Sequence, residues 1–391
     1  MSTNQDPKFY AIHFMPYADL PEDVDQYPST WVDFPNKHFN PENGRLFYER
    51  YISELILADK LGFDGICFNE HHQSAYSMMP SAALIAAHLA PQTKHAKLCA
   101  FGPLVNLQYP NRTAEELAML DLLSGGRLEV GFPVGIPTEY FSSPSMINPT
   151  TARQRYFESL DIIRKIWSED GPFEYEGEIY NYRFLNVWPK PYQTPHPKVW
   201  LLGGASPETA QYAAEHGLKY ASAVMPFSVQ AKAFQAFRDQ ANEIGRKATS
   251  DDIMMGTFTY VAETDEIAVK EAIEHLSYYF KTFLKWAPQY GQPPGYVSPE
   301  SVKRMLSSGG VIDFSAMTQD DILTKMPVIV GSPDTVASRY EQLMEELGAT
   351  NIVSDMHYGN MPHWKTVKNL TMFAHEVMPR LKKKKTAHMH F

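Results

Sequence analysis

Short apolar, β-rich runs alternate with amphipathic helical patterns eight times along this chain of 391 residues. Parallel strands need crossover connections, which helices usually supply, so the alternation predicts a parallel α/β fold. Eight parallel strands are enough to close a barrel, and a barrel with insertions reaches this chain length. We therefore expect a single (β/α)8 TIM-barrel domain across residues 1–391. A doubly wound sheet would show the same alternation and is the competing architecture.

The boundaries of the expected elements follow from the hydrophobic periodicity and from turn glycines. The expected strands cover residues 9–17, 63–68, 97–104, 128–132, 198–202, 219–224, 253–262 and 351–356. The expected helices cover residues 45–61, 80–90, 113–124, 151–168, 207–216, 229–244, 266–284, 334–347 and 363–381. Insertions are expected after strands one, four and seven. They are a loop at 18–44, a hairpin at 173–187 with a connector at 188–197, and a long irregular segment at about 286–325.

The charge balance argues against several classes of partner. Lys and Arg number 35 and Asp and Glu number 45, which gives a net charge of −10. Binders of nucleic acids and of membrane surfaces carry basic patches, so neither partner is expected. No apolar run approaches the roughly 18–20 residues of a membrane span. The polar residues 1–8 do not form a signal-peptide core.

The cysteines and the C-terminal lysines are typical of a cytoplasmic protein. Cys67 and Cys99 both lie in apolar, strand-like runs, and we expect them to be reduced core residues. The lysine cluster at 382–385 follows a helical pattern, so we interpret it as a solvated helix end rather than a targeting signal.

Polar residues and glycines gather where the predicted strands end. In (β/α)8 barrels the chemistry lies on the loops after the carboxyl ends of the strands. Here those loops hold Asn69-Glu70-His71-His72, Phe101-Gly102-Pro103 with Asn106 and Arg112, Gly131-Phe132-Pro133-Val134-Gly135, and Gly203-Gly204-Ala205-Ser206. We expect all four loops to meet at one face of the barrel, which makes that face the candidate site.

The loop after the fifth strand has the features of a phosphate site. Its two glycines allow a close approach of the backbone, and Ser206 is placed to cap the helix that begins at Pro207. Free amides and the helix dipole favour an anion there, and Thr209 lies one turn further on the same side. A capped helix start without a ligand is the alternative interpretation.

The run Glu70-His71-His72 allows acid–base chemistry. An imidazole titrates near neutrality, so His71 is a candidate general acid or base. Two histidines and a carboxylate could also hold a metal, but adjacent residues of an extended segment point to opposite sides. We therefore expect no metal, and a purely structural role suits His72 better than His71. No G-x-G-x-x-G sequence opens a helix and no P-loop occurs, so a built-in nicotinamide dinucleotide site is not expected.

Several motifs, in order, resemble the bacterial luciferase family of flavin monooxygenases. Leu61-Gly62-Phe63-Asp64 followed by Glu70-His71-His72 is similar to the family's "GFD…EHH". The others are Tyr109-Pro110-Asn111-Arg112, Leu120–Arg127, Arg155-Tyr156, Ser206-Pro207-Glu208-Thr209 and Val330-Gly331-Ser332-Pro333. Each motif is weak alone, but the ordered set, which runs from about residue 9 to 380, is specific.

The resemblance implies a barrel that binds FMN and is usually dimeric. His71 matches the family's catalytic histidine, which assists formation or reaction of a flavin 4a-peroxide, and Glu70 would lie near the flavin and shape His71. Phe101 and Gly102 match the strand-end pair at the isoalloxazine ring, often joined by a non-proline cis peptide bond. The residues that match phosphate or ribityl contacts are Arg153, Tyr156, Gly204, Ala205, Ser206 and Thr209.

The chain departs from the family pattern after the fourth strand. Val134 stands where luciferases carry an arginine for the phosphate, so Arg153 or Arg155 is expected to supply that charge. The segments 18–44 and 286–325 are expected to form the substrate pocket. Arg112, Asp121 and Arg127 are expected to be structural. The apolar helix at 80–90 is expected to form a dimer face, with core burial as the alternative.

The function implied is a two-component monooxygenase. Reduced FMN (FMNH2) would come from a separate flavin reductase, and one oxygen atom of O2 would pass to a small organic substrate. The alternatives are a deazaflavin-dependent hydride-transfer oxidoreductase on the same barrel and a non-catalytic flavin-binding relative.

Overall fold

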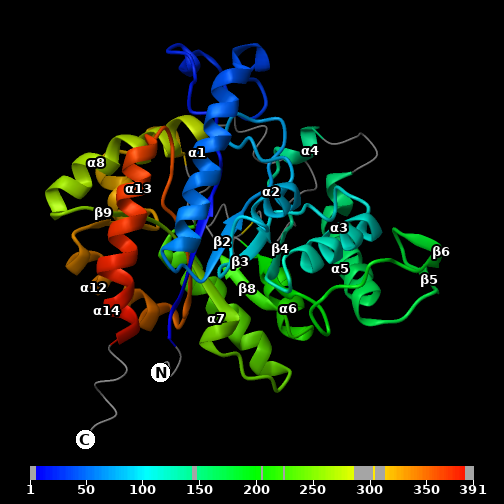
Figure 1. The fold of residues 1–391 in the computed structure, drawn as a ribbon. Helices are drawn as coiled ribbons and strands as arrows, with labels where there is room; N and C mark the ends of the chain where they lie inside the picture. Colours follow the sequence, from blue (N-terminus) through cyan, green and yellow to red (C-terminus); the bar gives the residue numbers. More distant parts are fainter. Residues whose placement is uncertain are drawn as a thin grey trace, which may run out of the picture.

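The computed structural model describes residues 6–142, 148–203, 206–222, 225–285, 303 and 313–383. Eight parallel strands form a closed barrel, which helices surround (Figure 1). The ring closes because β9 pairs with both β8 and β11, and β11 pairs with β1. The barrel strands are β1 Lys8–His13, β2 Gly65–Phe68, β3 Lys97–Phe101, β4 Leu128–Pro133, β7 Lys198–Leu202, β8 Lys219–Ser222, β9 Ile253–Val261 and β11 Asn351–Asp355. The closed ring confirms the predicted (β/α)8 barrel over a doubly wound sheet.

Helices connect the strands on the outside of the barrel, and a small hairpin of β5 (Phe173–Glu176) and β6 (Asn181–Leu185) projects away from it (Figure 1). The helices are α1 Pro41–Lys60, α2 Ala82–Leu89, α3 Pro110–Leu123, α4 Glu139–Ser142, α5 Ala152–Ser168, α6 Pro207–Glu215, α7 Phe227–Glu243, α8 Asp265–Tyr278, α11 Gln319–Lys325, α12 Pro333–Leu347, α13 His363–Met372 and α14 Met378–Lys383. Among the described helices, none has the length and apolar character that crossing a bilayer requires.

Two predicted strands end earlier than their apolar sequence suggests. β1 stops at His13 rather than residue 17, because Met15 takes a positive φ of 51° that a strand does not allow. β3 stops at Phe101 rather than residue 104. The residues beyond both strands, including Phe14, Leu104 and Val105, are buried in loops, so their apolar character reflects burial and not strand pairing.

The segment before α12 contains elements that the periodicity did not predict. β10 (Val328–Gly331) is an additional strand that pairs in parallel with the far half of the nine-residue β9, beyond the barrel ring. α11 lies inside the segment expected to be irregular, most of which is outside the described residues. α8 ends at Tyr278 and continues as a π-helix, Tyr279–Phe283, instead of running to residue 284.

The barrel interior is packed with side chains, as in other barrels of this class. Residues from seven strands form one buried cluster there, namely Tyr10, Cys67, Cys99, Phe101, Trp200, Ala221, Met254 and Val353. Cys67 and Cys99 lie opposite each other on β2 and β3 and are buried, which confirms that they are core residues.

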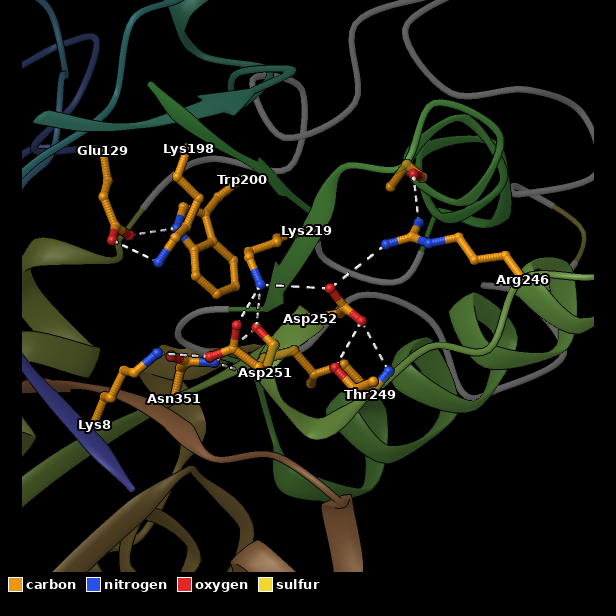
Figure 2. Close-up of polar contacts among 12 residues, drawn as sticks. Lys8, Glu129, Lys198, Trp200, Lys219, Arg246, Thr249, Asp251, Asp252 and Asn351 are labelled. Atoms are coloured by element: carbon orange, nitrogen blue, oxygen red, sulfur yellow. Dashed lines mark hydrogen bonds and ion pairs between the residues drawn. The ribbon is translucent and has the colours of Figure 1, made fainter. Parts of the chain in front are cut away.

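Charged side chains close the other end of the barrel, where the strands begin (Figure 2). Asp251 accepts hydrogen bonds from Lys8 and Lys219, each at 2.7 Å, just before β9. Glu129 of β4 accepts from Lys198 at 2.7 Å and from the indole nitrogen of Trp200 at 2.8 Å. The first set of bonds ties the starts of β1, β8 and β9 together, and the second ties β4 to β7, at the end of the barrel away from the candidate site.

Asp251 gives the fold an acid-sensitive contact. Partial burial alone would raise the pKa of Asp251, but hydrogen bonds from Lys219 and Lys8 outweigh it and lower the pKa from 3.8 to about 2. Because the pKa of Asp251 is lower in the folded protein than the ordinary value of 3.8, the ionised side chain stabilises the fold above pH 3.8. This stabilisation is lost as the pH falls toward 2. Asp251→Asn should therefore cost about 1 kcal/mol at pH 7, after solvent screening. The exposed Asp239→Asn is the control in urea unfolding, and a deficit for Asp251→Asn that persists undiminished at pH 2 would contradict the ion-pair account.

Candidate functional site

A cavity of about 400 Å³ opens at the carboxyl ends of the barrel strands. This volume lies in the range of small-molecule and cofactor pockets. The predicted site residues that line it are Glu70, His71, Phe101, Gly102, Arg153, Ser206 and Thr209. The loops after β2, β3 and β7 thus meet at a single opening. Gly204 and Ala205 lie outside the described residues.

His71 is paired with a buried glutamate that the sequence did not single out. The Nδ1 atom of His71 lies 2.8 Å from Oε1 of Glu139, at the start of α4. The other oxygen of Glu139 accepts the backbone N–H of His72 at 3.3 Å. A carboxylate on Nδ1 favours the tautomer that carries its proton there, which leaves the lone pair of Nε2 for acid–base work. The sequence gives only one indication that Glu139 belongs to the site, which is its position as a lone acid in the loop after the fourth strand.

Glu70 holds the loops around the cavity together. Its Oε1 atom accepts from the Gln108 side chain at 2.8 Å and from the Leu104 N–H at 3.3 Å. Its Oε2 atom accepts from the Ala82 N–H at the start of α2 at 3.4 Å. The carboxylate that contacts His71 is therefore that of Glu139, whereas Glu70 joins the end of β2 to α2 and to the loop after β3.

Gly102 directly follows β3 and packs against Asn69 and Glu70, which follow β2. A Cβ atom at this position would come within 2.4 Å of the backbone nitrogen of Glu70. Only glycine fits such a contact without displacing the backbone. The cis peptide bonds among the described residues precede Pro172, Pro189 and Pro195, and the bond between Phe101 and Gly102, which is often cis in the family, is not among them.

The opposite side of the mouth, at the start of α6, has a donor set that suits a phosphate. Ser206 caps α6, and its hydroxyl accepts from Nη1 of Arg153 at 2.7 Å and donates to Glu208 at 2.6 Å. The hydroxyl of Thr209 is buried at the cavity without a hydrogen-bond partner among the described residues. A buried hydroxyl is costly to leave unpaired, so an anion at this helix start would satisfy it.

A second copy of the same sequence pattern shows what such a helix start binds. Ser332 caps α12 in the sequence Ser332-Pro333-Asp334-Thr335, which parallels Ser206-Pro207-Glu208-Thr209. There the Asp265 carboxylate accepts from the Ser332 N–H at 2.6 Å and from the Thr335 hydroxyl at 2.9 Å. The α12 pattern thus cradles a carboxylate supplied by the chain itself.

The structure separates the two candidate arginines. Arg153 reaches Ser206, whereas Nε of Arg155 donates to the Asn106 carbonyl at 3.1 Å. Arg153 is therefore the cation at the proposed phosphate position. Tyr156 is not brought to the cavity, because it is fully buried and its hydroxyl donates to the Phe132 carbonyl at 2.7 Å.

The three residues expected to be structural, Arg112, Asp121 and Arg127, bond to other parts of the chain outside the cavity. Arg127 donates to the carbonyl oxygens of Ala90 and Ala96, and buried Asp121 accepts twice from Gln193. Arg112 forms surface ion pairs with the neighbouring acids of α3. None of the three lines the cavity.

A separate buried cluster lies between the barrel and helices α1 and α13. Nitrogen atoms of His13 and His357 each lie 2.9 Å from Oε2 of Glu54, and this trio has the spacing of a metal site. However, Nδ1 of His13 accepts the Met15 N–H at 2.8 Å, so the proton sits on Nε2 and points at Glu54. Burial lowers the pKa of His13 to about 4, which keeps this ring neutral. The lone pair that an ion would need on Nε2 is therefore absent, and we interpret the trio as a hydrogen-bonded cluster.

The fold and the cavity define the class of protein as a (β/α)8 barrel with a carboxylate-paired histidine and a set of arginine and hydroxyl side chains at one opening. The family profile for luciferase-like monooxygenases matches residues 46–351, and the chain belongs to this family.

Known proteins with similar sequence or structure agree with this family. The oxygenase component of the flavin-dependent trigonelline monooxygenase of Acinetobacter baylyi is 27% identical over 61% of this chain and 66% of its own length. The oxygenating constituent of 3,6-diketocamphane monooxygenase of Pseudomonas putida, solved in complex with FMN, has a TM-score of 0.73 at 22% identity, over 96% of this chain and 99% of that one. The coenzyme F420-dependent tetrahydromethanopterin reductase of Methanopyrus kandleri has a TM-score of 0.64 at 19% identity, over 97% and 100% of the chains. The two structures show the shared fold.

Proposed function

We propose that this protein is the oxygenase component of a two-component, FMNH2-dependent monooxygenase. The observation that carries the proposal is that His71 and the phosphate-type donors Arg153, Ser206 and Thr209 line the same cavity. The sequence similarity to the A. baylyi oxygenase component, whose name specifies a flavin, supports the choice of cofactor and reaction.

In this proposal each part of the chain has one task. Arg153, Ser206 and Thr209 hold the phosphate of FMN, and Gly102 lets the ring approach the end of β3. Bound FMNH2 supplies two electrons, so that one atom of O2 enters the substrate and the other leaves as water, with FMN as the oxidised product. His71, oriented by Glu139, donates and accepts the protons of this reaction at its Nε2 atom. The side chains of Phe14, Trp31 and Tyr76, which also line the cavity, exclude water from the ring together with the closed barrel beneath it.

The reaction is tested by supplying FMNH2 from a flavin reductase, with O2 and a panel of small organic compounds. Mass spectrometry should show a product with one added oxygen atom, and ¹⁸O2 should label it. Hydride transfer with a deazaflavin in place of oxygenation would support the alternative enzyme, which the F420-dependent structural relative makes a specific rival. Binding of FMN without any turnover would support a non-catalytic flavin protein.

Glu139→Gln tests how His71 is oriented. The substitution keeps the shape of the Glu139 side chain but removes the negative charge that faces Nδ1 of His71. A hydrogen bond to a charged group contributes about 1.5–3 kcal/mol. Turnover should therefore fall by roughly 10- to 100-fold. FMN affinity should change little, because Glu139 lies on the His71 side of the cavity. Full activity in Glu139→Gln, or an equal fall in FMN affinity, would contradict a positioning role.

We also propose that the protein is a homodimer formed through α2 and α3. Leu84 of α2 is 70% exposed, and Met119 and Leu123 of α3 are 50% and 61% exposed, although large apolar side chains favour burial. Leu84→Glu combined with Met119→Glu should convert dimer to monomer in sedimentation, whereas Leu46→Glu on α1 should not. A wild-type protein that sediments as a monomer would contradict the dimer.

The proposal places the enzyme in the cytoplasm, where Cys67 and Cys99 stay reduced.

A further inference from the structure

The cavity has an aromatic wall on the side opposite the phosphate-type donors. Its members are Phe14, Trp31, Tyr76, Tyr279, Leu284 and Phe314. They come from the end of β1, the loops after β1 and β2, and the segment after β9. In the ring of eight strands, β1 lies directly across from β7, which precedes Ser206. A ring held through a phosphate at Ser206 thus leaves the aromatic wall for the substrate.

The polar atoms of this wall bond to one another or to the backbone. The indole nitrogen of Trp31 donates to the Phe283 carbonyl, and the hydroxyls of Tyr76 and Tyr279 lie 2.7 Å apart. Burial raises the pKa of both tyrosines well above the ordinary value, so they stay neutral. Two described acids, Glu70 and Glu139, line the cavity, and each already accepts hydrogen bonds from the loops around it or from His71. Asp355 acts on both tyrosines from inside the barrel, and its burial raises its pKa well above the ordinary value. Among the described wall residues none carries a charge, so an ionised substrate would lose its water without compensation.

The geometry of the wall favours aromatic rings. Trp31 stacks on Tyr76 with ring centroids 4.2 Å apart, and meets the His71 ring edge-on at 5.1 Å and 90°. The Trp31–Tyr76 stack covers one face of each ring, which leaves less open π-surface for a cation. A flat neutral ring packed on Trp31 would gain offset or edge-to-face contact and would lie beside His71.

We propose that the enzyme acts on small, neutral aromatic substrates, and that Trp31 is the residue that selects them. This inference rests on the proposed function, because it identifies the molecule that the same cavity would oxygenate. Trp31 lies in the first long loop, and it joins substrate recognition to the proton-transfer group through its contact with His71.

The test is a binding measurement that does not depend on turnover. Full-length protein, with and without oxidised FMN, is titrated calorimetrically with three bicyclic probes of matched size: neutral 2-naphthol, anionic 2-naphthoate and cationic N-methylquinolinium. We expect 2-naphthol to bind at least about tenfold more tightly than either ion, because an unpaired charge costs more than 1.4 kcal/mol to bury, which corresponds to that factor. Equal or tighter binding of either ion overturns the neutral class. Equal binding of decahydro-2-naphthol, the saturated analogue, overturns the aromatic preference.

Variants of the first loop test the role of Trp31. Trp31→Ala should weaken 2-naphthol binding by roughly fivefold or more, and Trp31→Phe should restore most of the affinity, because it keeps an aromatic ring. Phe39→Ala, in the same loop but outside the cavity, is the matched control. Unchanged affinity in Trp31→Ala, or a loss in Trp31→Phe as large as in Trp31→Ala, overturns the role of Trp31. Selective binding of 2-naphthol by a protein that never oxygenates any compound would refute the proposed reaction and leave the neutral aromatic preference standing.

Discussion

His71→Ala is expected to lower turnover by about 10²- to 10⁴-fold while the protein still folds and binds FMN. The imidazole lines the cavity beside the aromatic wall, and its buried partner Glu139 lines the same cavity and holds its Nδ1 atom. Removing the ring deletes the proton donor and acceptor without touching the phosphate-type donors on the other side of the mouth. The measurement is single-turnover product formation with pre-bound FMNH2, which separates chemistry from cofactor binding.

His72→Ala is the matched control, because His72 is the adjacent imidazole. A hydrogen bond to Glu70 raises the pKa of His72, so this side chain belongs to the loop-holding contacts of Glu70 and not to the proposed proton transfer. It should keep most of the activity. Full activity in His71→Ala, or equal losses in both variants, would remove His71 from the chemistry.

Ser206→Ala combined with Thr209→Val is expected to weaken FMN binding by about 100-fold or more. The unpaired Thr209 hydroxyl would donate to a charged phosphate, and the Ser206 hydroxyl would turn to it from Glu208. Such a bond contributes about 1.5–3 kcal/mol. Riboflavin lacks the phosphate, so its affinity should change little. Fluorescence titration of both flavins measures the difference directly.

The second Ser-Pro-acid-Thr sequence provides the control for this pair. Ser332→Ala with Thr335→Val removes the same two hydroxyls from α12, where Asp265 already occupies the helix start. This variant should lose stability but not flavin affinity. Equal losses of FMN and riboflavin in the α6 variant would place the phosphate elsewhere.

The sequence predicted what depends on periodicity and on strand-end chemistry. The barrel followed from eight alternations, and the convergence of His71, Gly102 and Ser206 followed from the rule that strand ends share one face. The ends of β1 and β3 were placed too late, because apolar loop residues such as Phe14 and Leu104 are buried under later parts of the chain. Burial by distant segments leaves no periodic signal.

Glu139 and Trp31 show why individual residues of the site could not be picked out, although Trp31 lies in the segment 18–44 that was expected at the pocket and lines the cavity. Glu139 contacts a residue 68 positions earlier, and Trp31 bonds to a carbonyl 252 positions later. Pairings of such separation are set by the closure of the barrel and not by local pattern. Tyr279 faces the cavity from a π-helix, which the continuous helical pattern at 266–284 did not indicate.

A crystal structure of the protein with FMN is the most direct test of the proposed arrangement. We expect the phosphate oxygens to accept hydrogen bonds from the Ser206 and Thr209 hydroxyls and from Arg153. The isoalloxazine ring should lie over Gly102, with His71 at its edge and the aromatic wall facing its open side. A phosphate bound away from α6, or a ring that does not approach His71, would contradict the account.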